Sequence, residues 1–233
     1  MYAERSARSL PGAVVWTRSG PHTGGEYRVL PDGCTDIIWA DGRLLVAGPD
    51  SRAFVARDAP DREYAAIRFA PGQGPSVLGV EAHELRNQRV PLDALWPAAE
   101  ARRLAEQVAD APDRAAAVEA LAVRRLRDAA PPPAYVGPVV AALRAGRTVA
   151  EVADRTGLGE RTLHRRSLAA FGYGPKTLAR VLRLNRALDL ARGGLPYAEV
   201  AAAAGYADQA HLAREVKTLA GVALGELLQD SEA

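Results

Sequence analysis

The sequence predicts an α+β protein that begins with short strands and ends in helices. Three observations support this prediction. Runs of β-branched and aromatic residues alternate with turn residues from 12 to 69, helical periodicity prevails after 135, and one pattern occurs twice between 148 and 228. The 233 residues, with 48% hydrophobic and 25% charged side chains, fit a soluble globular protein of one large domain or two small ones.

Residues 1–97 are predicted to form a small antiparallel β-barrel or sandwich with some helix. Asp41-Gly42 is a strong signal for a two-residue hairpin. The segment Ser76–Leu85 is predicted as a helix with Ser76 as its N-cap. The predicted strands are Val14–Trp16, Glu26–Leu30, Ile37–Trp39, Leu44–Val46 and Tyr64–Phe69.

Residues 98–134 are predicted to be a helical linker, with helices near 98–109 and 112–128 followed by a proline-rich spacer that no helix can continue. In the second helix, Ala116, Val118, Leu121 and Leu126 share an apolar face. We expect this face to form the contact of a homodimer.

Residues 135–233 are predicted to be entirely helical. Glycine and proline residues divide the segment, with Gly157 ending one helix and Pro175 opening a long one. The seven predicted helices are 136–145, 149–156, 160–170, 175–192, 197–204, 208–219 and 223–228.

The repeated pattern lies in this helical part. Val149-Ala150-Glu151-Val152-Ala153, Gly157 and Leu163-His164-Arg165 recur as Tyr197-Ala198-Glu199-Val200-Ala201, Gly205 and Leu212-Ala213-Arg214. The first helices align at an offset of 48 residues (149 to 197) and the second at 49 (163 to 212), so the second turn is one residue longer. A short helix, a glycine and a second helix with outward polar residues are typical of a helix-turn-helix.

The second helix of such a unit enters the major groove of DNA, so its outward side chains are candidate base readers. In the first copy Arg161, His164 and Arg165 share one helical face, and arginine is the usual partner of guanine. The alternative is that these are solvated faces of amphipathic helices, but two such faces in a repeated frame favour DNA. The candidates in the second copy are Gln209, Ala210, Ala213 and Arg214, and the candidate phosphate contacts on the long helix are Lys176, Arg180, Arg183 and Arg186.

Charge is distributed unevenly along the chain. Residues 141–192 hold 11 basic and 4 acidic side chains, a net charge of +7, whereas residues 193–233 hold 2 basic and 6 acidic ones, a net charge of −4. We therefore expect the first copy to bind DNA more strongly than the second.

These residues resemble the DNA-binding domain of AraC-type transcriptional regulators, in which a long helix joins two helix-turn-helix units. The similarity covers about the last hundred residues and includes Phe171-Gly172-Tyr173-Gly174-Pro175-Lys176 and Gly205-Tyr206-Ala207-Asp208-Gln209. It departs at Ser167 and Val216, where the family usually has phenylalanine. Leu30–Ile38 and Ile67–Gly72 resemble the cupin-like N-terminal domain of many such regulators, which implies a barrel for effector sensing or dimerisation.

Other chemistry has weaker signals in the N-terminal part. Trp16, Tyr27, Trp39 and Tyr64 are core residues by default and would line an effector pocket if the barrel has a cavity. Asp32 and Asp36 flank a turn and are expected to bond their own backbone, and the lone Cys34 is either a small buried hydrophobe or a redox-sensing thiol. A metal site has only His22, His83 and Glu63 as candidates, without metal-ligand spacing.

The sequence therefore predicts a sequence-specific DNA-binding transcriptional regulator that responds to a small-molecule effector. We expect no cofactor and no catalysis, because phosphate-loop, C-x-x-C and nucleophile motifs are missing. No apolar run could span a membrane and no secretory signal is evident, so we expect a cytoplasmic protein. The alternatives are a metal-dependent cupin enzyme with an accessory helical domain and a protein-binding adaptor that has lost DNA binding.

Overall fold

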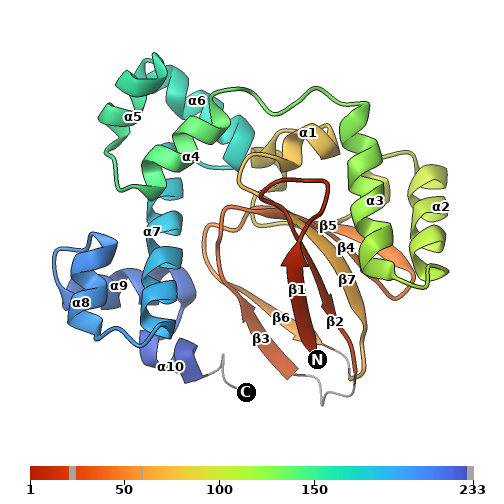
Figure 1. The fold of residues 1–233 in the computed structure, drawn as a ribbon, viewed down its shortest axis with the longest axis horizontal. Coiled ribbons are helices and arrows are strands. Elements are labelled where there is room, and N and C mark those ends of the chain that lie inside the picture. The colour runs from red at the N-terminus through yellow and green to blue at the C-terminus, as the bar shows by residue number, and fades with distance from the viewer. Residues whose placement is uncertain (21–24, 59, 230–233) are drawn as a thin grey trace.

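The computed structural model describes residues 1–20, 25–58 and 60–229, and it consists of an antiparallel sheet with its covering helices beside an all-helical domain (Figure 1). The larger sheet has the strand order β1-β2-β7-β4-β5-β8, and β3 pairs with β6 in a second, two-stranded sheet. The predicted α+β class is confirmed. The strands are β1 (Tyr2–Ser6), β2 (Val14–Arg18), β3 (Gly25–Val29), β4 (Thr35–Ala40), β5 (Arg43–Ala47), β6 (Phe54–Asp58), β7 (Tyr64–Phe69) and β8 (Arg89–Pro91).

All five predicted strands are present, but β1, β6 and β8 were not predicted. β1 is an exposed edge strand with few β-branched residues, and β8 spans only three residues and ends in proline, so neither carries a strong strand signal. The hairpin prediction at Asp41-Gly42 is confirmed: both residues have positive φ, +49° and +72°, as a type I′ turn between β4 and β5 requires.

The predicted helix Ser76–Leu85 is wrong in extent and in its N-cap. Instead, α1 (Gly74–Leu78) begins before Ser76 and stops at Gly79, whose φ of +79° is left-handed, and a separate 3₁₀ turn, η1 (Ala82–Leu85), follows. Glycine has no Cβ and adopts this conformation without steric strain, so the helix can end here despite the apolar periodicity.

One face of the larger sheet carries the N-terminal core. Val15, Ile67 and Ile37 lie in register on that face, across β2, β7 and β4, and are at most 1% exposed. The helices α2 (Ala98–Ala109) and α3 (Arg114–Arg127), preceded by the 3₁₀ turn η2 (Leu92–Ala94), cover it (Figure 1).

The two helices of the expected linker segment therefore complete the core of the sheet. Leu104, Val108, Val118 and Leu121 belong to the same buried cluster as Ile37. The predicted dimer face is thus mostly used inside its own chain, because Val118 and Leu121 are 0% and 3% exposed. The proline-rich stretch 130–133 has no regular secondary structure, as expected.

Seven helices follow in the described part of the chain, as predicted. They are α4 (Val136–Arg144), α5 (Val149–Thr156), α6 (Glu160–Phe171), α7 (Pro175–Arg192), α8 (Tyr197–Ala204), α9 (Gln209–Ala220) and α10 (Leu224–Gln229). α7 runs between two groups of helices, α4 to α6 at one end and α8 to α10 at the other (Figure 1). We call α5–α6 the first unit and α8–α9 the second unit.

Each unit packs on its own part of α7. Leu163 and Phe171 are buried with Leu178 and Val181 in one cluster, and Leu212 and Val216 are buried with Leu184 and Leu188 in another. The two departures from the family pattern lie in these cores: Val216 fills its place as a hydrophobe, whereas Ser167 is fully buried with an Oγ that has no hydrogen-bond partner among the described residues.

The N-terminal domain contacts both units. A Cβ on Gly72, which has a φ of +86°, would lie 2.5 Å from Val136 Cγ1 and 2.8 Å from Phe171 Cε1, so the backbone there lies directly against the first unit. At the other end, the backbone N–H of Ala53 donates to the carbonyl of Leu219 over 2.6 Å. The N-terminal domain therefore contacts both ends of the C-terminal helical domain.

Among the helices of the described residues, none combines the length and the apolar character needed to cross a bilayer.

Candidate nucleic-acid interface and effector site

In both units the first helix ends at a left-handed glycine, but the residues that cap the helix N-termini differ. In the first, Thr148 and Glu151 form a reciprocal capping box at the start of α5, and Gly157 ends the helix at a φ of +64°. In the second, Gly205 ends α8 at a φ of +85°, and Asp208 caps α9 by accepting the N–H of His211 over 2.6 Å. The longer second turn supplies this aspartate, which the first unit replaces with Gly159.

The three candidate base readers of the first unit lie together on the exposed side of α6. Arg161, His164 and Arg165 are exposed, whereas Leu163 and Ser167 on the same helix are fully buried. Burial of one side therefore presents the other side, with two guanidinium groups and an imidazole, to solvent.

The candidate readers of the second unit are also exposed. Gln209, Ala210, Ala213 and Arg214 line the open side of α9, while Leu212 and Val216 anchor its inner side. This surface carries one cation and one amide, so it has less positive charge than the exposed side of α6.

The four candidate phosphate contacts of α7 divide into two pairs. Lys176 and Arg186 are exposed, but Arg180 and Arg183 both bind Glu215 of α9, at Nε–Oε2 3.2 Å and Nη2–Oε1 2.7 Å. Arg183 also lies over the ring of Tyr206, with Cζ 4.6 Å from the centroid. Although burial opposes its charge, the hydrogen bond and charge of Glu215 raise the pKa of Arg183.

Glu215 was missed by the sequence reasoning. Its side chain is 10% exposed and joins the second unit to α7 through both arginines. The available signal was its position three residues after the buried Leu212, which places it on the inner flank of α9 opposite the arginine-rich helix.

Two of the four candidate effector residues, Trp16 and Tyr64, lie on the face of the larger sheet that α2 and α3 do not cover, and a third, Tyr27, comes from β3 of the smaller sheet. Trp16 lies between Tyr2 and Tyr64, with ring centroids 6.1 and 6.2 Å apart, and Arg18 of the same strand as Trp16 lies 4.8 Å over the ring of Tyr27. Trp39 does not belong to this group.

Trp39 is a core residue on the opposite face of the sheet. It pairs in register with Ala65, whereas Trp16 pairs with Ala66, and adjacent residues of a strand point to opposite faces. Its side chain is 6% exposed and its Nε1 donates to the carbonyl of Ala105 over 3.1 Å. Trp39 is therefore a core residue, which was the default expectation for it.

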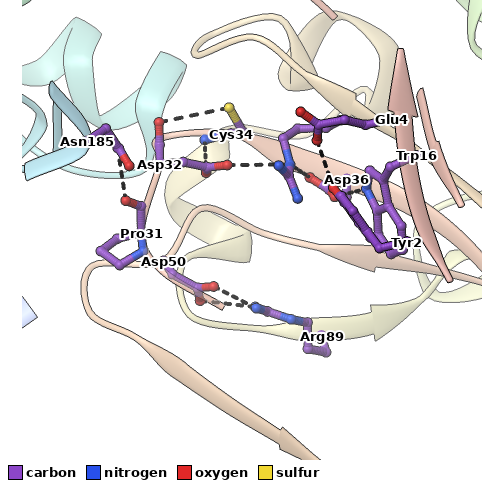
Figure 2. Close-up of polar contacts among 11 residues, drawn as sticks. Tyr2, Glu4, Trp16, Pro31, Asp32, Cys34, Asp36, Asp50, Arg89 and Asn185 are labelled. Atoms are coloured by element: carbon purple, nitrogen blue, oxygen red, sulfur yellow. Dashed lines mark hydrogen bonds and ion pairs between the residues drawn. The ribbon is translucent and has the colours of Figure 1, made fainter. Parts of the chain in front are cut away.

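A buried polar cluster lies beside the aromatic row (Figure 2). Trp16 Nε1 donates to Asp36 Oδ2 over 2.8 Å, and Arg68 Nε lies 3.4 Å from both Asp36 Oδ1 and Asp32 Oδ2. Burial raises the pKa of Asp36 to about 6, with the charge of Arg68 opposing the shift. The sequence pattern did not single out Arg68, because an arginine in an exposed-looking alternation is typical of a solvated strand face.

The expectation that turn aspartates bond their own backbone is right for Asp32 and wrong for Asp36. Asp32 Oδ1 accepts the N–H of Cys34 over 2.8 Å, whereas Asp36 lies within β4 and bonds across strands. Burial, together with the charges of Asp32 and Asp36, raises the pKa of the Cys34 thiol well above its usual value. Because the thiolate is the reactive form, this environment disfavours a redox-sensing role for Cys34.

The candidate metal ligands have other partners. His83 Nδ1 lies 3.1 Å from Glu81 Oε2, and Glu63 Oε2 binds Arg114 Nη1 over 2.6 Å. His22 lies outside the described residues. Within the described ranges, no three His, Cys, Asp or Glu side chains gather closely enough to hold a metal ion.

Comparison with known proteins identifies two domains in the chain. Residues 152–230 match the model of a helix-turn-helix domain, and residues 13–91 match a domain of unknown function, DUF6597. None of the curated proteins compared with the chain matches it.

Solved structures give a likeness over nearly the whole chain. An apo variant of ToxT from Vibrio cholerae strain SCE256 matches with 10% identity and a TM-score of 0.52 over 92% of this chain and 97% of its own. Another ToxT structure from Vibrio cholerae, in a P21 crystal form, matches with 10% identity and a TM-score of 0.53 over 98% of both chains. A probable AraC family transcriptional regulator from Rhodopseudomonas palustris CGA009 matches with 24% identity and a TM-score of 0.37 over 42% of this chain and 98% of its own.

At 10% identity the ToxT structures share the fold with this chain. That fold and the helix-turn-helix match confirm the resemblance that the repeated motif predicted.

Proposed function

We propose that the protein is a transcriptional regulator that binds specific DNA sequences and responds to a small-molecule effector through its N-terminal domain. The C-terminal part of the chain is a helix-turn-helix domain of the AraC type. The observation that carries the proposal is the pair of recognition helices, α6 and α9, at opposite ends of α7, each with its polar side exposed (Figure 1). Two such helices in one chain can reach successive major-groove segments about 34 Å apart on one face of the duplex.

The roles within this surface follow from exposure and chemistry. Arg161, His164 and Arg165 read bases in one half-site, with arginine addressing guanine. Lys176 and Arg186 contact phosphates, which position the protein without reading sequence. The readers of the second half-site are Gln209, Ala210, Ala213 and Arg214 of α9.

Selection of genomic DNA fragments with the purified protein, followed by mobility-shift titrations, tests this function. The affinity for a selected fragment should fall steeply between about 50 and 200 mM salt, because phosphate contacts release counterions. Arg161→Ala should weaken binding, whereas Arg102→Ala, which removes an exposed cation of α2 on the N-terminal domain, should not. Failure to enrich any fragment, or an affinity independent of salt, would favour the adaptor alternative.

The domain division belongs to the same proposal. Residues 1–97, together with the helices of 98–128, form the sensing domain, because Leu104 and Val118 share its buried core. Residues 129–134 are the spacer, and residues 135–233 form the DNA-binding domain. The effector binds beside Trp16, Tyr27 and Tyr64, where the rings are only partly buried.

We also propose that the protein is a homodimer, with a contact that differs from the one expected from sequence. The half-buried Ala116 and Val123 and the exposed Ala120 of α3 line a groove of about 520 Å³ beside α2. Light scattering at micromolar concentration should give twice the chain mass, and Ala120→Glu should restore the monomer mass. A monomeric wild-type protein would overturn this part of the proposal and leave DNA binding untouched.

A further inference from the structure

The segment Pro31–Cys34, between β3 and β4, lies at the boundary of the two domains. Its backbone contacts α7, and the Asp32 side chain belongs to the polar cluster of the sheet. The Pro31–Asp32 peptide therefore joins the polar contacts that begin at Trp16 to the hydrogen bond from Asn185 (Figure 2). We call this stretch the 31–34 segment.

On one side the 31–34 segment is fixed to the DNA-binding domain. Asn185 Nδ2 of α7 donates to the carbonyl of Pro31 over 3.1 Å, across 154 residues of sequence. A Cβ on Gly33, which has a φ of +81°, would lie 3.3 Å from Leu178 Cδ1 and 3.4 Å from Tyr173 Oη. The glycine therefore lets the backbone lie against α7 without a side chain between them.

On its other side the 31–34 segment is fixed to the sheet by Asp32. One oxygen of its carboxylate accepts the N–H of Cys34, which closes the turn, and the other lies 3.4 Å from Arg68 Nε. Arg68 in turn lies 3.4 Å from Asp36, which accepts the indole N–H of Trp16. Any change at the aromatic face that draws Arg68 away removes the partner of Asp32.

The contact with α7 is incompletely satisfied in this arrangement. Tyr173 is 2% exposed, and its Oη has no hydrogen-bond partner among the described residues, although Asp32, Cys34 and Asp50 are close enough to influence its pKa. A buried hydroxyl without a hydrogen-bond partner is destabilising. The packing of this residue against the 31–34 segment is therefore not reinforced by a hydrogen bond from its hydroxyl.

We propose that the 31–34 segment couples the Arg68–Asp32 ion pair to α7, the helix on which both recognition helices pack. Loss of this ion pair loosens the contact between the two domains and weakens specific DNA binding. The proposal rests on the proposed DNA-binding function. In the docked arrangement the readers of α6 and α9 are exposed, and contacts with the N-terminal domain at Gly72 and Ala53 restrain both ends of the DNA-binding domain. A DNA-binding domain that is less restrained loses more conformational entropy when it binds DNA, so it binds more weakly. Because such coupling is reciprocal, DNA must also change the surroundings of Trp16.

The first test is Asp32→Asn, with Asp41→Asn as its matched control. Asparagine keeps an acceptor for the N–H of Cys34 and loses only the charge facing Arg68. Asp41 also pairs with an arginine, Arg62, but in the exposed hairpin at the far end of β4, at a φ of +49° that asparagine tolerates. Affinity for a selected DNA fragment should fall about fivefold or more in Asp32→Asn and stay within twofold in Asp41→Asn.

A second variant approaches the coupling from the DNA-binding domain. Asn185→Ala removes the hydrogen bond to Pro31, together with one to the Val181 carbonyl within α7, while leaving the polar cluster intact. The affinity of this variant for DNA should also fall. In the double variant Asp32→Asn, Asn185→Ala, the two losses should not add, because both remove one connection. If Asp32→Asn lowers the thermal midpoint too far for a titration, Asn185→Ala alone decides.

Tryptophan fluorescence gives the reciprocal readout, because all three tryptophans, Trp16, Trp39 and Trp96, lie in the N-terminal domain. Adding the DNA fragment should change the emission of the wild-type chain, and Trp16→Phe should abolish that change. Wild-type affinity in both Asp32→Asn and Asn185→Ala, with emission unaffected by bound DNA, would overturn the coupling. A wild-type chain that binds no DNA would instead overturn the proposed function.

Discussion

The two helix-turn-helix units have the same frame and are held in place by different chemistry. Leu163 of α6 and Leu212 of α9 occupy equivalent positions at 0% and 1% exposure, and both recognition helices end at a left-handed glycine, Gly172 and Gly221. The first unit adds apolar contact with the N-terminal domain around Gly72, whereas the second is joined to α7 by Glu215 and its two arginines.

This difference shows how a duplicated fold can divide its charges between binding and structure. The net charge of +7 in residues 141–192 overstates the cations available to DNA, because Arg180 and Arg183 are bound to Glu215. The first unit keeps Arg161 and Arg165 exposed and free of such a partner among the described residues. Four predictions probe the contrast, beginning with the largest expected effect.

The cores of the two units should be equally costly to disrupt. Leu163→Ala and Leu212→Ala should each lower the free energy of unfolding by roughly 3 kcal/mol, because each leaves a cavity in a closely packed cluster. Denaturant titration of the full chain measures the loss, and Arg214→Ala at an exposed site should change it by less than about 0.5 kcal/mol. A much smaller cost for Leu212→Ala would mean that the second unit is less well packed than its frame suggests.

The reading surfaces should be unequal. Arg161→Ala should weaken binding to a selected fragment by about tenfold, since a bidentate guanine contact contributes roughly 1–3 kcal/mol of discrimination. Gln209→Ala should weaken it less, because the second unit lies in the acidic part of the chain. Mobility-shift titrations of both variants at one salt concentration provide the comparison, and equal losses would refute the asymmetry.

The attachment of the second unit should depend on charge. Glu215→Gln leaves Arg180 and Arg183 without their carboxylate, so the free energy of unfolding should fall by roughly 1.5–3 kcal/mol, the usual range for a hydrogen bond to a charged group. Glu226→Gln, on α10 of the same domain, is the control because its carboxylate makes no ion pair within the described residues. Equal stability of the two variants would show that packing alone holds the second unit.

The smallest expected effect concerns the cations of α7. Lys176→Ala and Arg186→Ala should each reduce the slope of log affinity against log salt by about 0.9, the contribution of one phosphate contact. Arg183→Ala should change the slope less and the stability more, because this side chain is committed to Glu215 and Tyr206. Identical slope changes in all three variants would mean that the ion pairs open when DNA binds.

Local signals were sufficient for most of the fold. The repeat, the glycine helix ends, the Asp41-Gly42 hairpin and the five predicted strands each depend on residues close in sequence, and the structure agrees with all of them. The errors occurred where such signals were weak or misleading. The edge strands β1 and β8 lack an apolar pattern, and Gly79 divides a stretch whose periodicity suited one helix.

The candidate sites were less predictable because they depend on which surfaces meet. Alternation along β2 and β4 could not reveal that Trp16 and Trp39 point to opposite faces, since that follows from the register through β7. The apolar face of α3 was visible in the sequence, but its partner, the sheet rather than a second subunit, was not.

Two helix-turn-helix units joined by a long helix could be predicted from the sequence alone, because helix periodicity, capping and glycine termination are local properties. Which charges remain available and how the domains are joined depend on the tertiary structure. Glu215 meets Arg183 across 32 residues, and Pro31 meets Asn185 across 154. Contacts between residues so far apart in sequence arise from the packing of whole helices and strands. The local sequence around one partner therefore gives no indication of the other.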